Sequence, residues 1–83
     1  MKFRAEIDIM PLKALLDPQG KAVTASMGNV GLSEITNVRI GKHITLEIDA
    51  KNKDVANNKV TESCKKLLAN QIMESFEFTL EEL

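Results

Sequence analysis

The first ten residues alternate strictly between apolar and charged side chains, and this pattern constrains the fold more than any other feature of the chain. In an extended segment, successive side chains point to opposite faces, so alternation predicts a strand with one face on a core and one face in solvent. The apolar face comprises Phe3, Ala5, Ile7 and Ile9, and the charged face comprises Lys2, Arg4, Glu6 and Asp8.

The same alternation returns three times later in the chain. It runs through Thr36–Ile40, Ile44–Ile48 and Phe76–Leu80. Gly41 and Lys42 separate the first two of these segments, which predicts an antiparallel β-hairpin with its turn at the glycine. We therefore expect four strands.

Two helices are expected between the strands. Asp17 is a favoured N-cap residue and Pro18 suits the first helical position, so helix one is predicted from Pro18 to about Asn29, closed by Gly31. Helix two is predicted in the segment 52–70, where Glu62 and Lys66 are spaced as an i,i+4 ion pair and Asn70 is a plausible left-handed stop. Its apolar stripe consists of Val55 or Ala56, Val60, Cys64, Leu67 and Leu68.

The order βαββαβ predicts an α+β fold: a two-layer sandwich, ferredoxin-like or a close variant, with a four-stranded, mainly antiparallel sheet and two helices on one face. With 83 residues, the chain has room for one core, so residues 1–83 are expected to form a single domain. The open face would carry charges of both signs and no aromatic side chains. That composition does not suit base stacking by an RNA-recognition domain.

Charge and cysteine content limit the classes of partner. Eleven basic residues against twelve acidic ones give a formal net charge of −1, so neither nucleic acid nor a membrane surface is an expected partner. The single cysteine, Cys64, cannot form an internal disulfide, which favours the reducing cytoplasm. A core this small, with neither disulfide nor metal, favours self-association.

The chain offers few groups for catalysis. His43, the only histidine, is expected on the polar side of a strand, and Cys64 is expected in the core, so neither has an evident partner for nucleophilic or metal chemistry. Phosphate chemistry of the acylphosphatase type would need a glycine-rich cradle, which "PLKALLDPQG" does not provide. We expect no catalytic residue, metal site or cofactor in this chain.

Two short stretches stand out without deciding a function by themselves. "LLDPQGKAV" is read as a cap and helix start, although a helix N-terminus can also hold an anion. "VRIGK" places two cations around a turn glycine, which can be solvated or can grip an acidic group. A stand-alone, dimeric, small-molecule-binding regulatory domain of ferredoxin-like fold is the alternative that these residues leave open.

Taken together, three collinear blocks resemble the PurS subunit family of phosphoribosylformylglycinamidine (FGAM) synthase. "LLDPQGKAV" resembles the family's entry to helix one, and "GLSEITNVRIGKHITLEI" has its spacing of Val-Arg-x-Gly-Lys before an alternating strand. "CKKLLANQIMESFEF" follows its Cys-x-x-Leu-Leu-Ala-Asn ending. With the first strand, the resemblance covers essentially the whole chain.

The resemblance implies a non-catalytic role in de novo purine biosynthesis. Such subunits associate as homodimers or homotetramers and join a PurQ-type glutaminase to a PurL-type synthetase, so that ammonia passes between the two active sites. ATP and Mg²⁺ would be used by the synthetase partner. The residues that the resemblance marks as candidates for partner contact are Asp17, Pro18, Gly20, Arg39, Gly41 and Lys42, with Asn70 and Glu74 in second rank.

Overall fold

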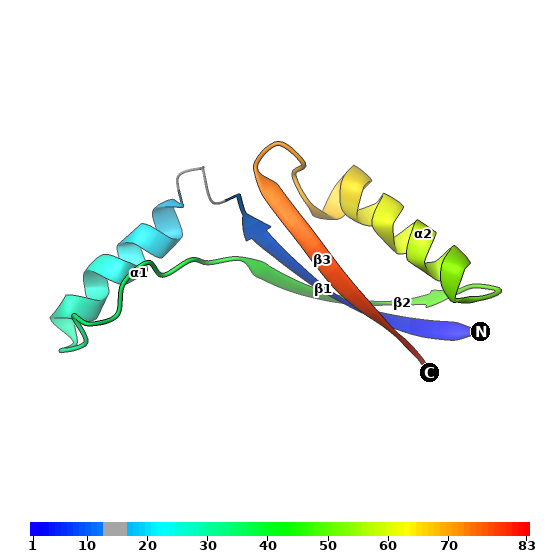
Figure 1. Cartoon of the computed structure of the whole chain (residues 1–83), viewed down its shortest axis with the longest axis horizontal. Coiled ribbons are helices and arrows are strands. Elements are labelled where there is room, and N and C mark those ends of the chain that lie inside the picture. The colour runs from blue at the N-terminus through cyan, green and yellow to red at the C-terminus, as the bar shows by residue number, and fades with distance from the viewer. Residues whose placement is uncertain (13–16) are drawn as a thin grey trace.

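The computed structural model of the chain describes residues 1–12 and 17–83. Its elements follow in the order strand, helix, strand, helix, π-helix and strand (Figure 1). They are β1 (Lys2–Pro11), α1 (Pro18–Asn29), β2 (Lys42–Asp49), α2 (Lys53–Ser63), η1 (Cys64–Leu68) and β3 (Glu74–Glu82). Among the described residues, no helix combines the length and apolar character needed to cross a membrane.

The sheet has three strands in the order β2-β1-β3, and β1 pairs antiparallel with both neighbours. The alternation in β1 therefore lies at the centre of the fold, as the pattern predicts. The apolar positions of this strand are buried, with Phe3 at 1% exposure and Ala5, Ile7 and Ile9 at 0%. Both edges of the sheet, β2 and β3, are unpaired in the described chain.

Helix α2 covers the apolar face of the sheet. Asn52 caps it, because its side-chain oxygen accepts a hydrogen bond of 2.9 Å from the Val55 amide. Ala56 and Val60, and Cys64 at the start of η1, are at most 1% exposed, and Val60 and Cys64 share one cluster with the buried side chains of β1. The neighbouring apolar residues on the outer strands are only half-buried: Ile44, Leu46 and Ile48 on β2, and Phe76, Phe78 and Leu80 on β3.

The prediction that Leu67 belongs to the buried stripe is wrong, since this side chain is 82% exposed. Helix two changes to a π-helix at Cys64, and the Ala69 amide donates to the Cys64 carbonyl at 2.9 Å. This wider turn changes the phase of the last residues. Leu68 therefore packs against the core while Leu67 faces solvent.

The predicted fourth strand is also wrong. Residues 36–40 form no strand, because backbone donors that a hairpin would use are bound by side chains instead. The Val38 amide donates to Thr24 Oγ1 at 3.0 Å, and the Ile40 amide donates to Asp17 Oδ2 at 3.1 Å. The fold is α+β with three strands, and a ferredoxin-like topology is not confirmed.

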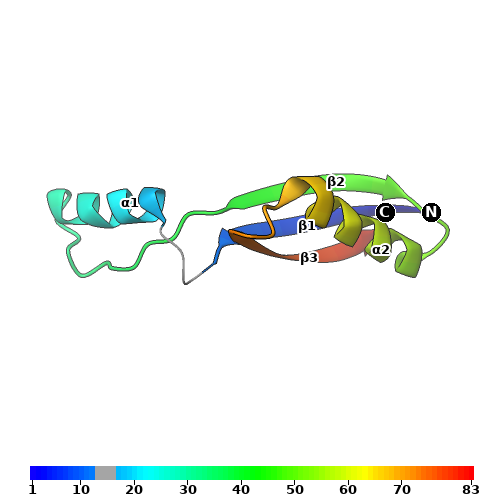
Figure 2. The same ribbon diagram turned by 90° about the horizontal axis from the view of Figure 1, so that it is seen from above.

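Helix α1 begins and ends as the sequence predicts, yet it does not cover the sheet. Asp17 caps its N-terminus and Gly31 follows its C-terminus with a φ of +81°. Figures 1 and 2 show α1 beyond one end of the sheet, so only one helix, not two, lies on the sheet face. We call α1 and the following segment up to residue 40 the arm. It lengthens the molecule to 51 × 26 × 14 Å.

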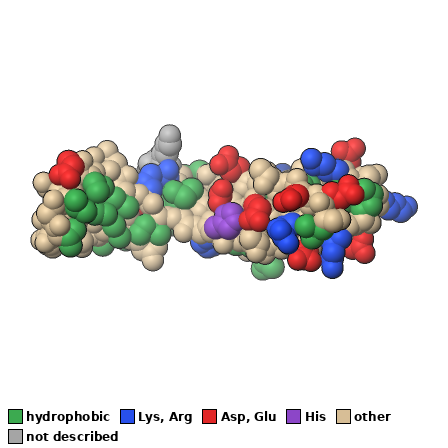
Figure 3. Space-filling model, turned by 90° about the horizontal axis from the view of Figure 1, so that it is seen from below, with side chains coloured by type: hydrophobic (Ala, Val, Ile, Leu, Met, Phe, Trp, Pro, Cys, Tyr) green, Lys and Arg blue, Asp and Glu red, His purple; other side chains and the backbone are tan. Residues whose placement is uncertain are grey.

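The open face of the sheet is charged, as the alternation predicts. Figure 3 shows acidic and basic side chains over the sheet on this side and apolar side chains gathered over the arm. His43 is exposed there, and its ring nitrogens lie 2.6 Å from Asp8 Oδ1 and 2.7 Å from Glu6 Oε2. These two carboxylates raise the pKa of His43, Asp8 contributing most.

Candidate functional site

Most of the residues marked by the sequence meet around one pocket of about 450 Å³. The pocket lies where the start of α1, the start of β2 and the turn before β3 come together. Its lining includes six of the eight candidates, Asp17, Pro18, Gly41, Lys42, Asn70 and Glu74. Gly20 and Arg39 lie outside this lining.

Asp17 joins the start of α1 to the segment that precedes β2. Its Oδ1 accepts a hydrogen bond of 3.0 Å from the Gly20 amide, and its Oδ2 accepts one of 3.1 Å from the Ile40 amide. These two donors, Gly20 first, lower the pKa of Asp17, and the nearby Arg39 charge adds to the effect. The carboxylate therefore binds two backbone amides that are twenty residues apart in sequence.

Gly20 and Gly41 are positions where the backbone comes too close to its surroundings for a side chain. A Cβ on Gly20 would lie 2.3 Å from the Val38 carbonyl oxygen and 2.4 Å from Asp17 Oδ2. A Cβ on Gly41 would lie 2.2 Å from the Ile9 carbonyl oxygen. Gly20 therefore lets the start of α1 lie against residue 38, and Gly41 lets the residue before β2 lie against β1.

Arg39 holds the same region from the other side, since its Nη2 donates to the Pro11 carbonyl oxygen at the end of β1. It also lines a second hollow of about 670 Å³ beside α1. In that hollow, Thr24 Oγ1 donates to the Gly20 carbonyl at 2.8 Å while accepting from Val38. The sequence does not single out Thr24, because its role depends on a contact fourteen residues away.

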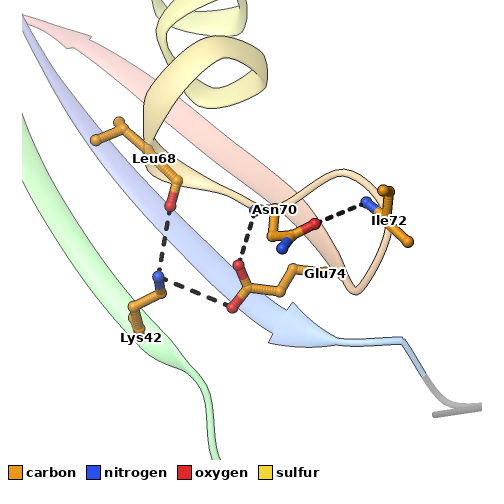
Figure 4. A network of polar contacts seen from close by, with 5 residues as sticks. All are labelled: Lys42, Leu68, Asn70, Ile72 and Glu74. Carbon is orange, nitrogen blue, oxygen red and sulfur yellow. Dashed lines mark hydrogen bonds and ion pairs between the residues drawn. The ribbon is translucent and has the colours of Figure 1, made fainter.

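Lys42, Asn70 and Glu74 form a polar network on the opposite wall of the pocket (Figure 4). Lys42 Nζ lies 3.8 Å from Glu74 Oε2 and 3.5 Å from the Leu68 carbonyl oxygen. Glu74 Oε1 accepts a hydrogen bond of 2.8 Å from the Asn70 amide, and Asn70 Oδ1 accepts one of 3.0 Å from the Ile72 amide. The network connects β2, β3 and the turn between η1 and β3.

Other groups that could take part in chemistry lie away from the pocket. Cys64 is fully buried, as predicted, and burial raises the pKa of its thiol. The predicted ion pair of Glu62 and Lys66 forms at 2.6 Å. Within residues 1–12 and 17–83, no three His, Cys, Asp or Glu side chains are grouped so that they could hold a metal ion.

Sequence reasoning missed three exposed apolar side chains at the end of the second helix and in the turn that follows it. Leu67 and Ile72 are each 82% exposed, and Met73, which lines the pocket, is 51% exposed. For Ile72 and Met73 the sequence did offer a signal of exposure, because two apolar residues stand in a turn between a helix and a strand. No pattern in the sequence marks Leu67 as exposed.

Comparison with known proteins agrees with this arrangement. Residues 4–82 match the family model described as PurS, phosphoribosylformylglycinamidine (FGAM) synthase. The chain belongs to the PurS family. It is 38% identical over 78 residues to a PurS subunit from Mycobacterium leprae, which covers 94% of this chain and 95% of that protein.

Solved PurS structures share the fold over nearly their whole length. A crystal structure of Bacillus subtilis PurS has a TM-score of 0.87 and 34% identity, and the match covers 96% of this chain and 99% of that one. A chain in a structure of PurLQS from Thermotoga maritima has a TM-score of 0.88 and 28% identity, with 98% and 99% covered. The three-stranded sheet with a projecting arm thus has close structural relatives in the PurS family.

Proposed function

We propose that this chain is a non-catalytic subunit of FGAM synthase that joins a PurQ-type glutaminase to a PurL-type synthetase in the cytoplasm. Membership of the PurS family supports the proposal, and so does the similarity to a chain from a PurLQS structure. The buried free thiol of Cys64 fits a reducing compartment. The chain would act by aligning two active sites so that ammonia crosses between them, which is an effect of proximity.

The observation that carries the proposal is the arm. An 83-residue domain of ordinary compactness has a radius of gyration of about 12 Å, whereas this chain has one of 16.4 Å. The arm exposes Val30, Leu32 and Ile35 at 68%, 42% and 39%. Exposed apolar surface of this kind is typical of a chain that completes its core in an assembly.

The sheet also has apolar side chains that are only partly covered. In the described part of the chain, α2 and η1 cover its apolar face, and the apolar side chains of both outer strands stay half-buried. We propose that the chain forms a homodimer or homotetramer in which the arm of one copy packs against another copy. A second helix, supplied by another copy, would then lie on the sheet face.

The side chains support a structural role over a catalytic one. Both ring nitrogens of His43 face carboxylates, and the thiol of Cys64 is buried with a raised pKa, which keeps it protonated at neutral pH. Under this proposal the chain holds no cofactor of its own. ATP and Mg²⁺ are used by the synthetase partner.

Reconstitution with the glutaminase and synthetase of the same organism tests the proposal. Formation of FGAM is measured once with glutamine and once with an ammonium salt as the nitrogen source. We expect the glutamine-dependent rate to require this chain and the ammonium-dependent rate of the synthetase to be independent of it. An equal glutamine-dependent rate without the chain, with no co-elution on a sizing column, would overturn the proposal.

The 450 Å³ pocket favours one second candidate, the small-molecule-binding regulatory domain. Its lining combines the apolar side chains of Ile40 and Met73 with the charged groups of Lys42 and Glu74. Native mass spectrometry of the protein purified from its host tests this alternative. A stoichiometric metabolite that Lys42→Ala releases would favour it over the scaffold.

A further inference from the structure

His43 lies between two carboxylates at the end of the sheet from which the arm departs. Asp8 is directly opposite His43 in the register of β1 and β2, so both side chains lie on the open face. Glu6, on the same face of β1, is the diagonal neighbour, and its longer side chain spans the greater separation. Nδ1 of the ring lies 2.6 Å from Asp8 Oδ1, and Nε2 lies 2.7 Å from Glu6 Oε2. One imidazole ring thus connects β2 to two positions of the central strand.

These distances indicate which form of the ring fits the site. An ionised carboxylate only accepts hydrogen bonds, and a neutral imidazole has one N–H donor and one bare nitrogen. A neutral His43 would therefore turn a lone pair towards one of the two carboxylates. An imidazolium donates at both nitrogens, and charge-assisted bonds of this kind are short. Both contacts of His43 are therefore satisfied together only when the ring carries two protons.

The neighbouring strand adds a further carboxylate to this cluster. Glu77 of β3 lies directly opposite Asp8, and like charges in this position repel each other. Glu6, Asp8 and Glu77 border one hollow of about 260 Å³. Arg4, the nearest basic residue on the same face of β1, has acidic residues opposite it on both neighbouring strands. The positive charge of His43 therefore offsets repulsion among three carboxylates.

The cluster lies at the root of the arm, by which we mean residues 41–43. The pairs of Asp8 with His43 and of Ile9 with Lys42 are the last two of the β1–β2 ladder on the side of the arm. Lys42, opposite the buried Ile9, belongs to the other face of the sheet. Gly41, next along the chain, lies against the Ile9 carbonyl oxygen. The contacts of His43 therefore fasten the first residues of β2, from which the chain continues into the arm.

We propose that His43 is a proton-dependent latch at the root of the arm: doubly protonated, it fastens the start of β2 to β1, and with one proton fewer it releases Glu6 and loosens the root. The proton passes to solvent, because the side chain is 51% exposed. The contact that stays is the one with Asp8, the residue directly opposite. The proposal goes beyond the function proposed above, since it assigns a pH-dependent change of conformation to this chain by itself.

The direction of the change follows from the charges that face the ring. The hydrogen bonds to Asp8 and Glu6, Asp8 first, raise the pKa of His43. The latch is therefore fully closed below the ordinary pKa of histidine and opens as the pH rises through the raised value. Histidine suits such a role because it changes charge near neutral pH.

Three single variants test the latch in the chain alone. His43→Gln keeps a polar side chain that cannot carry the charge, and Glu6→Gln removes the charge of one acceptor. Lys66→Gln is the matched control, because it removes the cation of a different ion pair, which Lys66 forms with Glu62 at 2.6 Å. NMR follows the ring nitrogens across a pH titration. Amide exchange is measured residue by residue, and each variant is compared with wild type at the same pH so that the intrinsic pH dependence of exchange cancels.

We expect both ring nitrogens of wild type to carry protons in mildly acidic buffer, with a titration midpoint above 6.5 that Glu6→Gln lowers. In that buffer the amides of residues 42–45 should exchange about twofold or more faster in His43→Gln than in wild type, as for the loss of an exposed ion pair. In alkaline buffer the two proteins should exchange alike. Residues 46–49, at the other end of β2, and the Lys66→Gln variant should show no such difference.

Three results would overturn the proposal. A midpoint at or below 6.5, or one that Glu6→Gln leaves unchanged, shows that the ring is not held between two carboxylates. An equal difference between wild type and His43→Gln in acidic and alkaline buffer shows that the contact does not depend on the proton. Faster exchange of residues 42–45 in Lys66→Gln attributes the effect to net charge. None of these measurements involves a partner subunit, so the reconstitution assay tests the proposed function separately.

Discussion

Gly41 offers the sharpest test of how the arm is joined to the sheet. It lies between the arm and β2, and a Cβ there would meet the Ile9 carbonyl oxygen at 2.2 Å and Met10 Sδ at 2.3 Å. The sulfur belongs to a flexible side chain and can move. The carbonyl belongs to the central strand, which is hydrogen-bonded on both sides, so Gly41→Ala forces a backbone shift of about 1 Å.

A forced shift of packed groups costs about 1–3 kcal/mol of unfolding free energy. For a domain of 60–100 residues, each kcal/mol lowers the melting temperature by about 4–8 °C. We therefore expect Gly41→Ala to melt at least about 4 °C below wild type. Thermal unfolding followed by circular dichroism measures this, at equal protomer concentration because association shifts apparent stability.

Gly28→Ala is the matched control. Gly28 lies in α1, and no atom lies within 4 Å of a Cβ built there. Alanine at an unstrained helical position stabilises by about 0.4–1 kcal/mol. If Gly41→Ala melts with wild type, or if Gly28→Ala is destabilised as much, the close approach to β1 is not what requires glycine at position 41.

Further predictions concern the burial and charge of single side chains. Leu67→Ala, at an exposed position, should change unfolding free energy in urea by less than about 0.5 kcal/mol, whereas Ile7→Ala should cost about 2–5 kcal/mol; equal losses would contradict the π-turn. His43 should titrate above 6.5 by NMR. Its contribution to stability is complete below the unfolded-state pKa and is lost as the pH rises through the folded-state pKa, so the advantage of wild type over His43→Gln should disappear in alkaline buffer. Cys64 should react with a thiol reagent slowly in buffer and rapidly in urea, and fast labelling of folded protein would mean that it is not buried.

The sequence predicts those parts of the fold that depend on local pattern. Alternation places β1 and its buried face correctly, and the pair of Asp17 and Pro18 places the start of α1. The segment 36–40 has an equally good strand pattern, yet its amides bind the side chains of Thr24 and Asp17. Alternation indicates which face of an extended segment is apolar, but it does not indicate which acceptor each backbone amide binds. The sequence alone therefore could not exclude the fourth strand.

The candidate site was predictable as a set of residues and not as a geometry. Motifs from three parts of the chain line one pocket, which only the folded chain brings together. The end of the second helix shows this limit most clearly. A single π-turn at Cys64 exchanges the environments of Leu67 and Leu68, and neighbouring leucines give no signal of which one is buried.

The position of Asp17 implies that some motif residues influence assembly without contacting a partner. Asp17 and Thr24 bind the backbone amides of Ile40 and Val38, just before β2, and Arg39 binds the carbonyl oxygen of Pro11 at the end of β1, so these bonds set the direction in which α1 projects. Asp17→Ala removes the acceptors of Gly20 and Ile40 and should leave the sheet, whose core lies elsewhere, intact.

We therefore expect Asp17→Ala to keep the β-sheet signal in circular dichroism and to weaken self-association in light scattering across a dilution series. Asp54→Ala, which changes an exposed acidic residue in the first turn of α2, is the charge-matched control and should associate like wild type. Because the pKa of Asp17 is lowered, its contribution is present above the unfolded-state pKa and is lost as the pH falls through the folded-state pKa. Wild-type protein should accordingly approach the behaviour of Asp17→Ala only in strong acid, and unchanged association of Asp17→Ala at neutral pH would show that packing, not this carboxylate, directs the arm.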